Sequence, residues 1–146
     1  MEYPILHVIH LFCAIAFIGV VFFEVLILEG VRDQLGDATM RGVEEGIINR
    51  AKRIMPWVVA TLFLTGFGLA FFHFKSMGNP FDSSLGIMLS VKILLALSVL
   101  VHFVTAIRSA HNGCMTSQRF ERTHISVFIH MVFIVLLAKG MFYIQW

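Results

Sequence analysis

The sequence predicts an all-α integral membrane protein, built as a four-helix up-down bundle. Its composition is 58% hydrophobic and 14% charged, whereas soluble domains average about 45–50% and about 25%. Four apolar runs, each near the roughly 20 residues that a helix needs to cross a bilayer, cover residues 3–28, 54–74, 85–107 and 125–143. Spanning backbone must satisfy its own hydrogen bonds, so each run is expected to be a helix. Short connections favour antiparallel neighbours, and residues 1–146 are expected to form a single transmembrane domain.

The first apolar run is expected to be a retained anchor. It has no basic segment before it, it is too long for a signal peptide, and no small-residue cleavage site follows. Cys13 lies within this run and Cys114 lies in a polar connection. The two thiols should sit far apart in depth, so no disulfide is expected.

The second helix is expected to begin well before its membrane span. Apolar residues recur at helical spacing ahead of it, at Val43, Ile47, Ala51 and Ile54. Asp37 is a candidate N-cap, and Pro56 predicts a bend. The stretch KSMGNPFDSSLG reads as a turn, with Ser83 or Ser84 starting the third helix. The chain shows no internal repeat and no low-complexity segment.

Basic residues predict the orientation. Two connections on one side of the predicted bundle hold Arg32, Arg41, Arg50, Lys52, Arg53, Arg108, Arg119 and Arg122. The positive-inside rule places these eight in the cytoplasm, which predicts a multi-pass protein of a bacterial inner membrane with both termini periplasmic. Aromatic residues would then mark the two interfaces: Tyr3, Tyr143 and Trp146 outside, and Trp57 inside.

Helical rise assigns a depth to each polar residue inside a span. An outer layer collects His7, His10, His73, Lys92 and Lys139, and an inner layer collects Glu24, His102 and His130. His10 and His102 differ in depth by roughly 15 Å on the helical rise, so they cannot share one iron. His102 is level with His130, and His7 or His10 is level with His73.

These layers predict two sites. His102 and His130 are expected to ligate a b-type haem, although interhelical hydrogen bonds are the structural alternative. His10, with His7 or His73, would form the second site, and the i,i+3 spacing of His7 and His10 also suits a transition metal.

Two charged residues accompany these sites. Lys92 would neutralise porphyrin propionates, or would extend to the interface instead. Glu24 is either an interfacial carboxylate, a proton carrier or a metal ligand near the inner site.

The first helix, IHLFCAIAFIGVVFF, resembles that of two related groups of four-helix membrane proteins, the CopD-type copper-resistance domain and the HemJ-type protoporphyrinogen oxidase. Both groups carry a histidine, an aromatic about seven residues on and then a glycine, here His10, Phe17 and Gly19. The resemblance extends to the basic NRAKRIMP before the second span, to SVKILLALSVLVHF in the third and to LLAKGMFY in the fourth.

The resemblance implies that His10 and Lys92 are family positions with a haem- or copper-linked role. Phe17 stands where these groups usually have tryptophan, and Glu24 lies where the HemJ-type group has Pro-Arg.

The predicted function is haem b binding, with one or two haems, in a redox or electron-transfer role. One alternative is a copper-handling membrane protein using His7 and His10, with Cys13 as a further candidate. The second is a haem-dependent membrane oxidoreductase that oxidises protoporphyrinogen. The third is a non-catalytic subunit whose histidines only stabilise packing. The expected surroundings are the lipid bilayer, a quinone or another redox partner, and a second copy of the chain; no nucleic-acid partner is expected.

Overall fold

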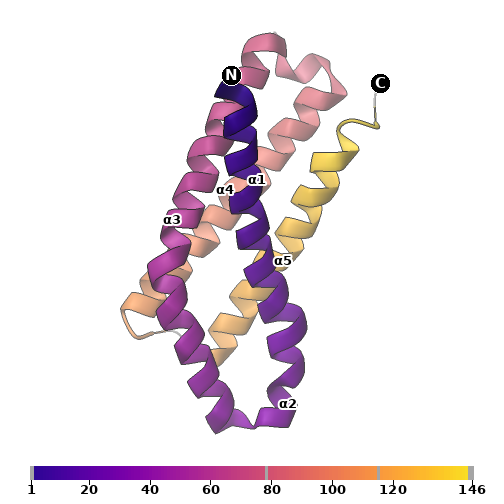
Figure 1. Ribbon diagram of the computed structural model, residues 1–146. Coiled ribbons are helices and arrows are strands. Elements are labelled where there is room, and N and C mark those ends of the chain that lie inside the picture. Colours follow the sequence, from indigo (N-terminus) through magenta and orange to yellow (C-terminus); the bar gives the residue numbers. More distant parts are fainter. Residues whose placement is uncertain (1, 78, 115, 145–146) are drawn as a thin grey trace.

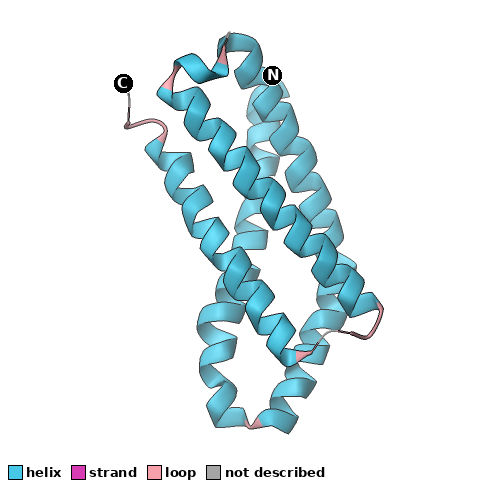
Figure 2. Ribbon diagram, turned by 180° about the vertical axis from the view of Figure 1, so that it is seen from behind, coloured by secondary structure: helices cyan, strands magenta, loops and turns pink. Residues whose placement is uncertain are grey.

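The computed structural model describes residues 2–77, 79–114 and 116–144, and within these ranges it contains helices and no strand (Figure 1, Figure 2). The all-α class is therefore confirmed. The elements are α1 (Glu2–Phe22), the π-helix η1 (Phe23–Leu28), the 3-10 helix η2 (Glu29–Val31), α2 (Arg32–Leu35), α3 (Asp37–Met77), the 3-10 helix η3 (Pro80–Asp82), α4 (Ser84–His111) and α5 (Ser117–Gly140).

Four helical stretches of the described chain are long and apolar enough to cross a membrane. They carry large hydrophobic side chains on their outer surfaces, among which Trp57 is 76% exposed and Leu64 is 73% exposed. Apolar surface on this scale is unusual for a soluble monomer and typical of a face that contacts lipid or another apolar phase. Trp146, expected at the outer interface, lies outside the described residues.

The helices pack as two close pairs, α1 with α3 and α4 with α5, and α1 also contacts α5. A small core joins all four long helices; its buried members are Phe17, Val21, Val59, Val99, Val127 and Met131. Both described ends of the chain lie at one end of the molecule, and α2 lies at the other (Figure 1).

The predicted starts of α3 and α4 agree with the structure to within one residue. Helix α3 begins at Asp37 and continues through Pro56, so the second helix does begin before the apolar run. Asp37 is the first residue of that helix and not the residue before it, a difference of the size usual at helix ends. Ser83 is the N-cap of α4, because its hydroxyl accepts from the Gly86 N–H at 3.2 Å.

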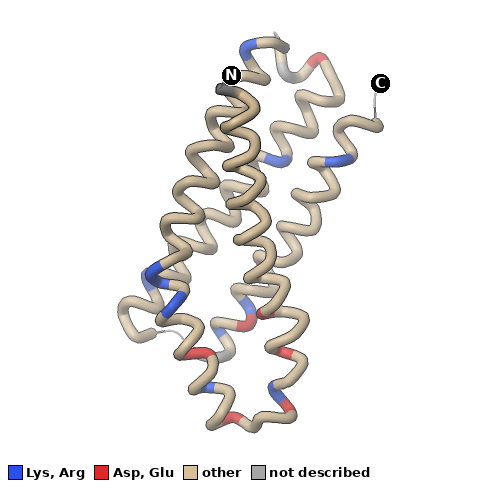
Figure 3. The backbone as a smooth tube through the Cα atoms, in the orientation of Figure 1, with Lys and Arg blue, Asp and Glu red and all other residues tan. Residues whose placement is uncertain are grey.

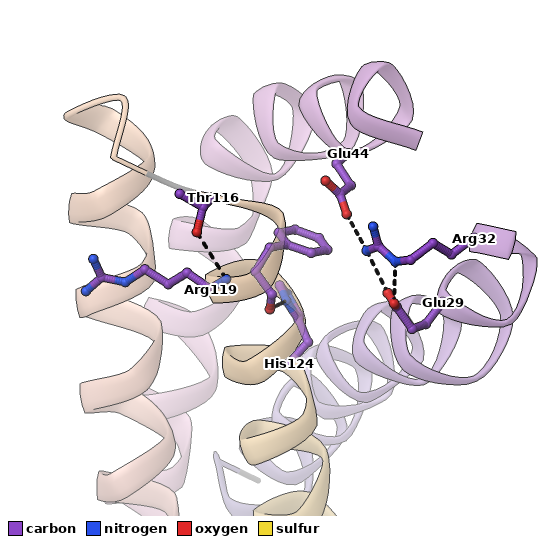
Figure 4. A network of polar contacts seen from close by, with 7 residues as sticks. Glu29, Arg32, Glu44, Thr116, Arg119 and His124 are labelled. Carbon is purple, nitrogen blue, oxygen red and sulfur yellow. Dashed lines mark hydrogen bonds and ion pairs between the residues drawn. The ribbon is translucent and has the colours of Figure 1, made fainter. Parts of the chain in front are cut away.

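Charged residues gather at the end of the molecule opposite the termini, and the long middle section carries few (Figure 3). At that end Arg32 joins the α1 side of the structure to α3. Its guanidinium pairs with Glu29 and, at 2.6 Å, with the buried Glu44 (Figure 4). This three-residue contact closes the turn between the first two membrane-length helices.

Candidate functional site

A reciprocal pair of serines and histidines joins α4 to α5. The His130 Nε2 lies 3.1 Å from the Ser98 hydroxyl, and the His102 Nε2 lies 3.1 Å from the Ser126 hydroxyl. Each Nδ1 lies 2.8 Å from a carbonyl in its own helix, that of Ser98 for His102 and that of Ser126 for His130. The ring centroids are 5.4 Å apart, so the prediction that the two histidines are level is confirmed.

These bonds determine the tautomer of both rings. A carbonyl oxygen only accepts, so each Nδ1 carries a hydrogen, and in a neutral imidazole each Nε2 then accepts from a serine hydroxyl. Both ring nitrogens of each histidine are hydrogen-bonded in this arrangement. Either Nε2 would have to leave its serine before it could bind iron.

The sequence carried a signal for this cluster that the sequence analysis missed. Ser98 to His102 reads SVLVH, and Ser126 to His130 reads SVFIH. The chain therefore does contain a short repeat, contrary to the expectation of none. A serine four residues before a histidine lies on the same helix face, which lets two antiparallel copies bond each other.

His10 is held differently, because only one of its ring nitrogens is engaged in the described structure. Its Nδ1 lies 3.0 Å from the Leu62 carbonyl and 3.1 Å from the Thr65 hydroxyl oxygen, both on α3. Nδ1 therefore carries the hydrogen and Nε2 keeps its lone pair. Gly66 lies against the same ring, and a Cβ at this position would come within 3.1 Å of the His10 Cε1.

The other outer-layer residues surround His10 only in part. Lys92 and His7 lie within electrostatic range of its ring. His73 instead meets Tyr3, whose hydroxyl lies 3.4 Å from the His73 Nε2, and the ring of His7 packs near the same tyrosine. Tyr3 thus stands between His7 and His73, a role that the sequence analysis did not assign.

Glu24 has a partner that the sequence analysis did not consider. Its side chain is 3% exposed, and its Oε2 lies 2.6 Å from the Nε2 of His124 on α5. The His124 Nδ1 lies 2.8 Å from the Phe120 carbonyl. No hydrogen bond of good geometry reaches that Glu24 oxygen within the described residues, so the two atoms are in close polar contact without a linear hydrogen bond. Glu24 lies in the first turn of the π-helix η1, and π-turns within α-helices are frequent at functional sites.

A cavity of about 80 Å³ opens beside Glu24 and His124 and is bounded by all four long helices. Besides Glu24 and His124, the charged residue Lys52 lines this cavity, and the rest of the lining is mainly apolar. Among its apolar lining residues are Phe17, Val21, Met55, Phe103 and Ala106. One water needs roughly 10–15 Å³ of such space, so this cavity has room for several.

No group of three or more His, Cys, Asp or Glu side chains in the described ranges is arranged to hold a metal ion. Histidines come singly, as at His10, or in a pair, as at His102 and His130. No protein-family model, curated protein or solved structure matches the chain.

Proposed function

We propose that this chain is an integral membrane protein that binds haem b through His10 and takes part in electron transfer. The observation that carries the proposal is the state of the His10 ring, with Nδ1 anchored on α3 and Nε2 without a partner among the described residues. Metal-ligating histidines are commonly held this way, because a bond at one nitrogen sets the tautomer and orients the other.

The donor set favours haem over a bare metal ion. The porphyrin supplies four nitrogens, so a haem iron needs one or two protein ligands, and single histidines suffice. Copper would need several donors from the protein itself. The resemblance to CopD-type and HemJ-type proteins points to the same histidine and supports membership of that group.

Lys92 would provide the charge that haem requires. It is a half-buried cation within α4, and no ion pair with it is recorded in the described chain. A buried charge needs a partner of opposite sign. The haem carries two propionates, and Lys92 lies within electrostatic range of His10, so one propionate would be its partner.

The residues around the iron would do three things. His10 would donate its Nε2 lone pair, and the Leu62 carbonyl would raise the basicity of the ring through Nδ1–H. Lys92 would pair with a propionate, as argued above. The haem itself would supply one-electron transfer, with a potential set by its axial ligands and by the polarity around it.

We propose His102 and His130, which were the first-choice haem ligands in the prediction from sequence, as the ligands of a second haem. Binding that haem would require both rings to release the serine hydroxyls. The loss of these two hydrogen bonds would lower the affinity for the haem. The His10 site has no such requirement, so we propose it as the primary one.

The visible spectrum of the purified protein tests the proposal. A Soret band is expected in the wild type and in His7→Ala, the matched control for an exposed histidine one turn away. His10→Ala is expected to lose the haem bound at His10 and to keep at most the second haem proposed at His102 and His130. A colourless wild type that retains copper, or full haem content in His10→Ala, would contradict the proposal. Loss of haem only in His102→Ala and His130→Ala would move the site to the inner layer.

The proposed setting is a bacterial inner membrane crossed four times as an up-down bundle, with both termini periplasmic. The lipid bilayer would cover the exposed apolar side chains. A quinone or another redox partner would exchange electrons with the haem, and a second copy of the chain would form a homo-oligomer. If the redox role is enzymatic, oxidation of protoporphyrinogen is the candidate, and growth rescue of a strain lacking that activity tests it.

A further inference from the structure

The contact between Glu24 and His124 requires one proton more than a carboxylate and a neutral imidazole, the usual forms of these side chains at neutral pH, carry together. The His124 Nδ1–H donates a hydrogen bond to the Phe120 carbonyl. In a neutral imidazole the Nε2 then has a lone pair and no hydrogen. A lone pair 2.6 Å from a carboxylate oxygen would be repulsive, so one further proton belongs to the pair.

The extra proton makes the pair electrically neutral as a unit. It lies either on Nε2, giving imidazolium and carboxylate, or on Oε2, giving imidazole and carboxylic acid. Both forms have zero net charge, which suits a carboxyl side chain that is 3% exposed. Loss of the proton would leave a carboxylate buried beside a neutral ring, with a net charge of −1.

The pair lines two cavities. One is the cavity bounded by all four long helices, which is large enough for water. The other is smaller, and Glu29 and Glu121 contribute two more carboxyl groups to it. A proton on the pair therefore borders both a polar neighbourhood and a space that can hold water.

Other charges bear on this pair from several elements. Lys52 of α3 lines the larger cavity, while Glu29 of η2 and Glu121 of α5 line the smaller one. Helix α4 contributes apolar side chains to the larger cavity, including Phe103 and Ala106. The Glu121 carboxylate favours a positive or protonated state of the pair and Lys52 opposes it, while Glu29 is already paired with Arg32.

We propose that Glu24 and His124 form a proton-exchange site, which holds one shared proton and passes it between the charged end of the molecule and water in the four-helix cavity. In the forward step the protonated pair releases H⁺ to a cavity water, giving H₃O⁺, a Glu24 carboxylate and a neutral His124. In the return step the pair takes H⁺ from the side of Glu29 and Glu121. No electron transfer is involved, so this proposal stands without the haem.

Infrared spectroscopy of the purified protein across a pH titration tests the site. The titration runs from about pH 5 to about pH 9, a range that brackets the ordinary pKa of histidine. The wild type is expected to show carboxyl and imidazole bands that change together and are lost in Glu24→Gln. His124→Gln is expected to remove the same bands, which keeps the test usable if one variant does not fold.

Glu44→Gln is the matched control. Glu44 is as buried as Glu24, at 4% exposed, but its recorded ion pair is with Arg32, which does not release its proton. The pH-dependent bands are expected to remain in this variant. Bands unchanged in Glu24→Gln, or removed equally by Glu24→Gln and Glu44→Gln, would overturn the proposal.

A second measurement tests the route through the cavity. Ala106→Leu places a larger side chain in the wall of the four-helix cavity. The rate at which the pair's proton exchanges with D₂O is expected to fall at least tenfold. Ala96→Leu, on the same helix and outside that lining, is expected to leave the rate unchanged. An unaltered exchange rate in Ala106→Leu would overturn the proton route through the four-helix cavity.

Discussion

At the scale of single residues, the histidines of this chain differ by which ring nitrogen is engaged. His102 and His130 use both nitrogens, His124 faces a carboxylate, and His10 keeps one nitrogen without a recorded partner. Seven histidines in an apolar chain are therefore not seven equivalent candidates. The hydrogen bond at one nitrogen decides what the other can do.

The serine–histidine cluster gives a prediction at this scale. Ser98→Ala removes the hydroxyl that bonds the His130 Nε2 and leaves that nitrogen unsatisfied. Interhelical hydrogen bonds in membranes contribute about 0.6 kcal/mol on average and about 1.7 kcal/mol at most. The free energy of unfolding is therefore expected to fall by about 1 kcal/mol. Denaturation in mixed micelles measures it.

Ser90→Ala is the control for this prediction. The Ser90 hydroxyl donates to the Gly86 carbonyl within α4 and makes no recorded bond to another helix. Its replacement is expected to change the free energy of unfolding by less than about 0.5 kcal/mol, as for most substitutions away from buried networks. Equal losses in Ser90→Ala and Ser98→Ala would show that the bond between the helices contributes nothing.

At the scale of elements, close approach of α1 to α3 positions His10. Gly66 lets the His10 ring reach the α3 backbone, and Gly68 makes room for Leu6 in the same way. Small residues at such contacts are the usual means by which membrane helices come close together. The helix pair, and not the histidine alone, thus prepares the free Nε2.

Gly66→Ala tests this element. A Cβ there would lie 3.1 Å from the His10 Cε1, and the ring cannot yield without lengthening its bonds to α3. Overpacking typically costs about 1–3 kcal/mol, which outweighs the roughly 0.5–1 kcal/mol that alanine gains over glycine in a helix. Reduced thermal stability and reduced haem content are expected.

Gly19→Ala provides the comparison, because no heavy atom lies within 4 Å of a Cβ at that position. Its stability is expected to equal or exceed that of the wild type, with unchanged haem content. If both glycine variants behaved alike, close packing around His10 would not be what prepares the ring.

At the scale of the whole molecule, charge is distributed unevenly between the two ends (Figure 3). The basic connections gather at the end opposite the described termini, which is the distribution expected if that end faces the cytoplasm. The Glu24–His124 pair would then exchange protons with the cytoplasmic side, and His10 would lie toward the periplasm.

Cysteine labelling measures this orientation. Cys114 is exposed in the connection before α5, whereas Cys13 is half-buried within α1, and both are free thiols. A membrane-impermeant maleimide is expected to label Cys114 in inverted vesicles and not in intact spheroplasts. Cys114→Ser is expected to abolish labelling in the inverted vesicles. Labelling of Cys114 in spheroplasts would invert the orientation.

The amino-acid sequence alone predicts the helical class, the four membrane-length helices and the early start of α3. These properties depend on local composition, because lipid and backbone hydrogen bonding leave an apolar run of this length few alternatives to a helix. Helical rise alone also placed His102 level with His130, since depth along a helix is a matter of counting residues.

Only the tertiary structure decided which polar groups meet. Glu24 and His124 are 100 positions apart, and their contact depends on how α1 and α5 are rotated about their axes. The anchoring of His10 on Leu62 and Thr65 likewise depends on the close approach of α3. Rotation and neighbour choice come from side-chain packing between helices, and hydropathy along one helix carries little information about them.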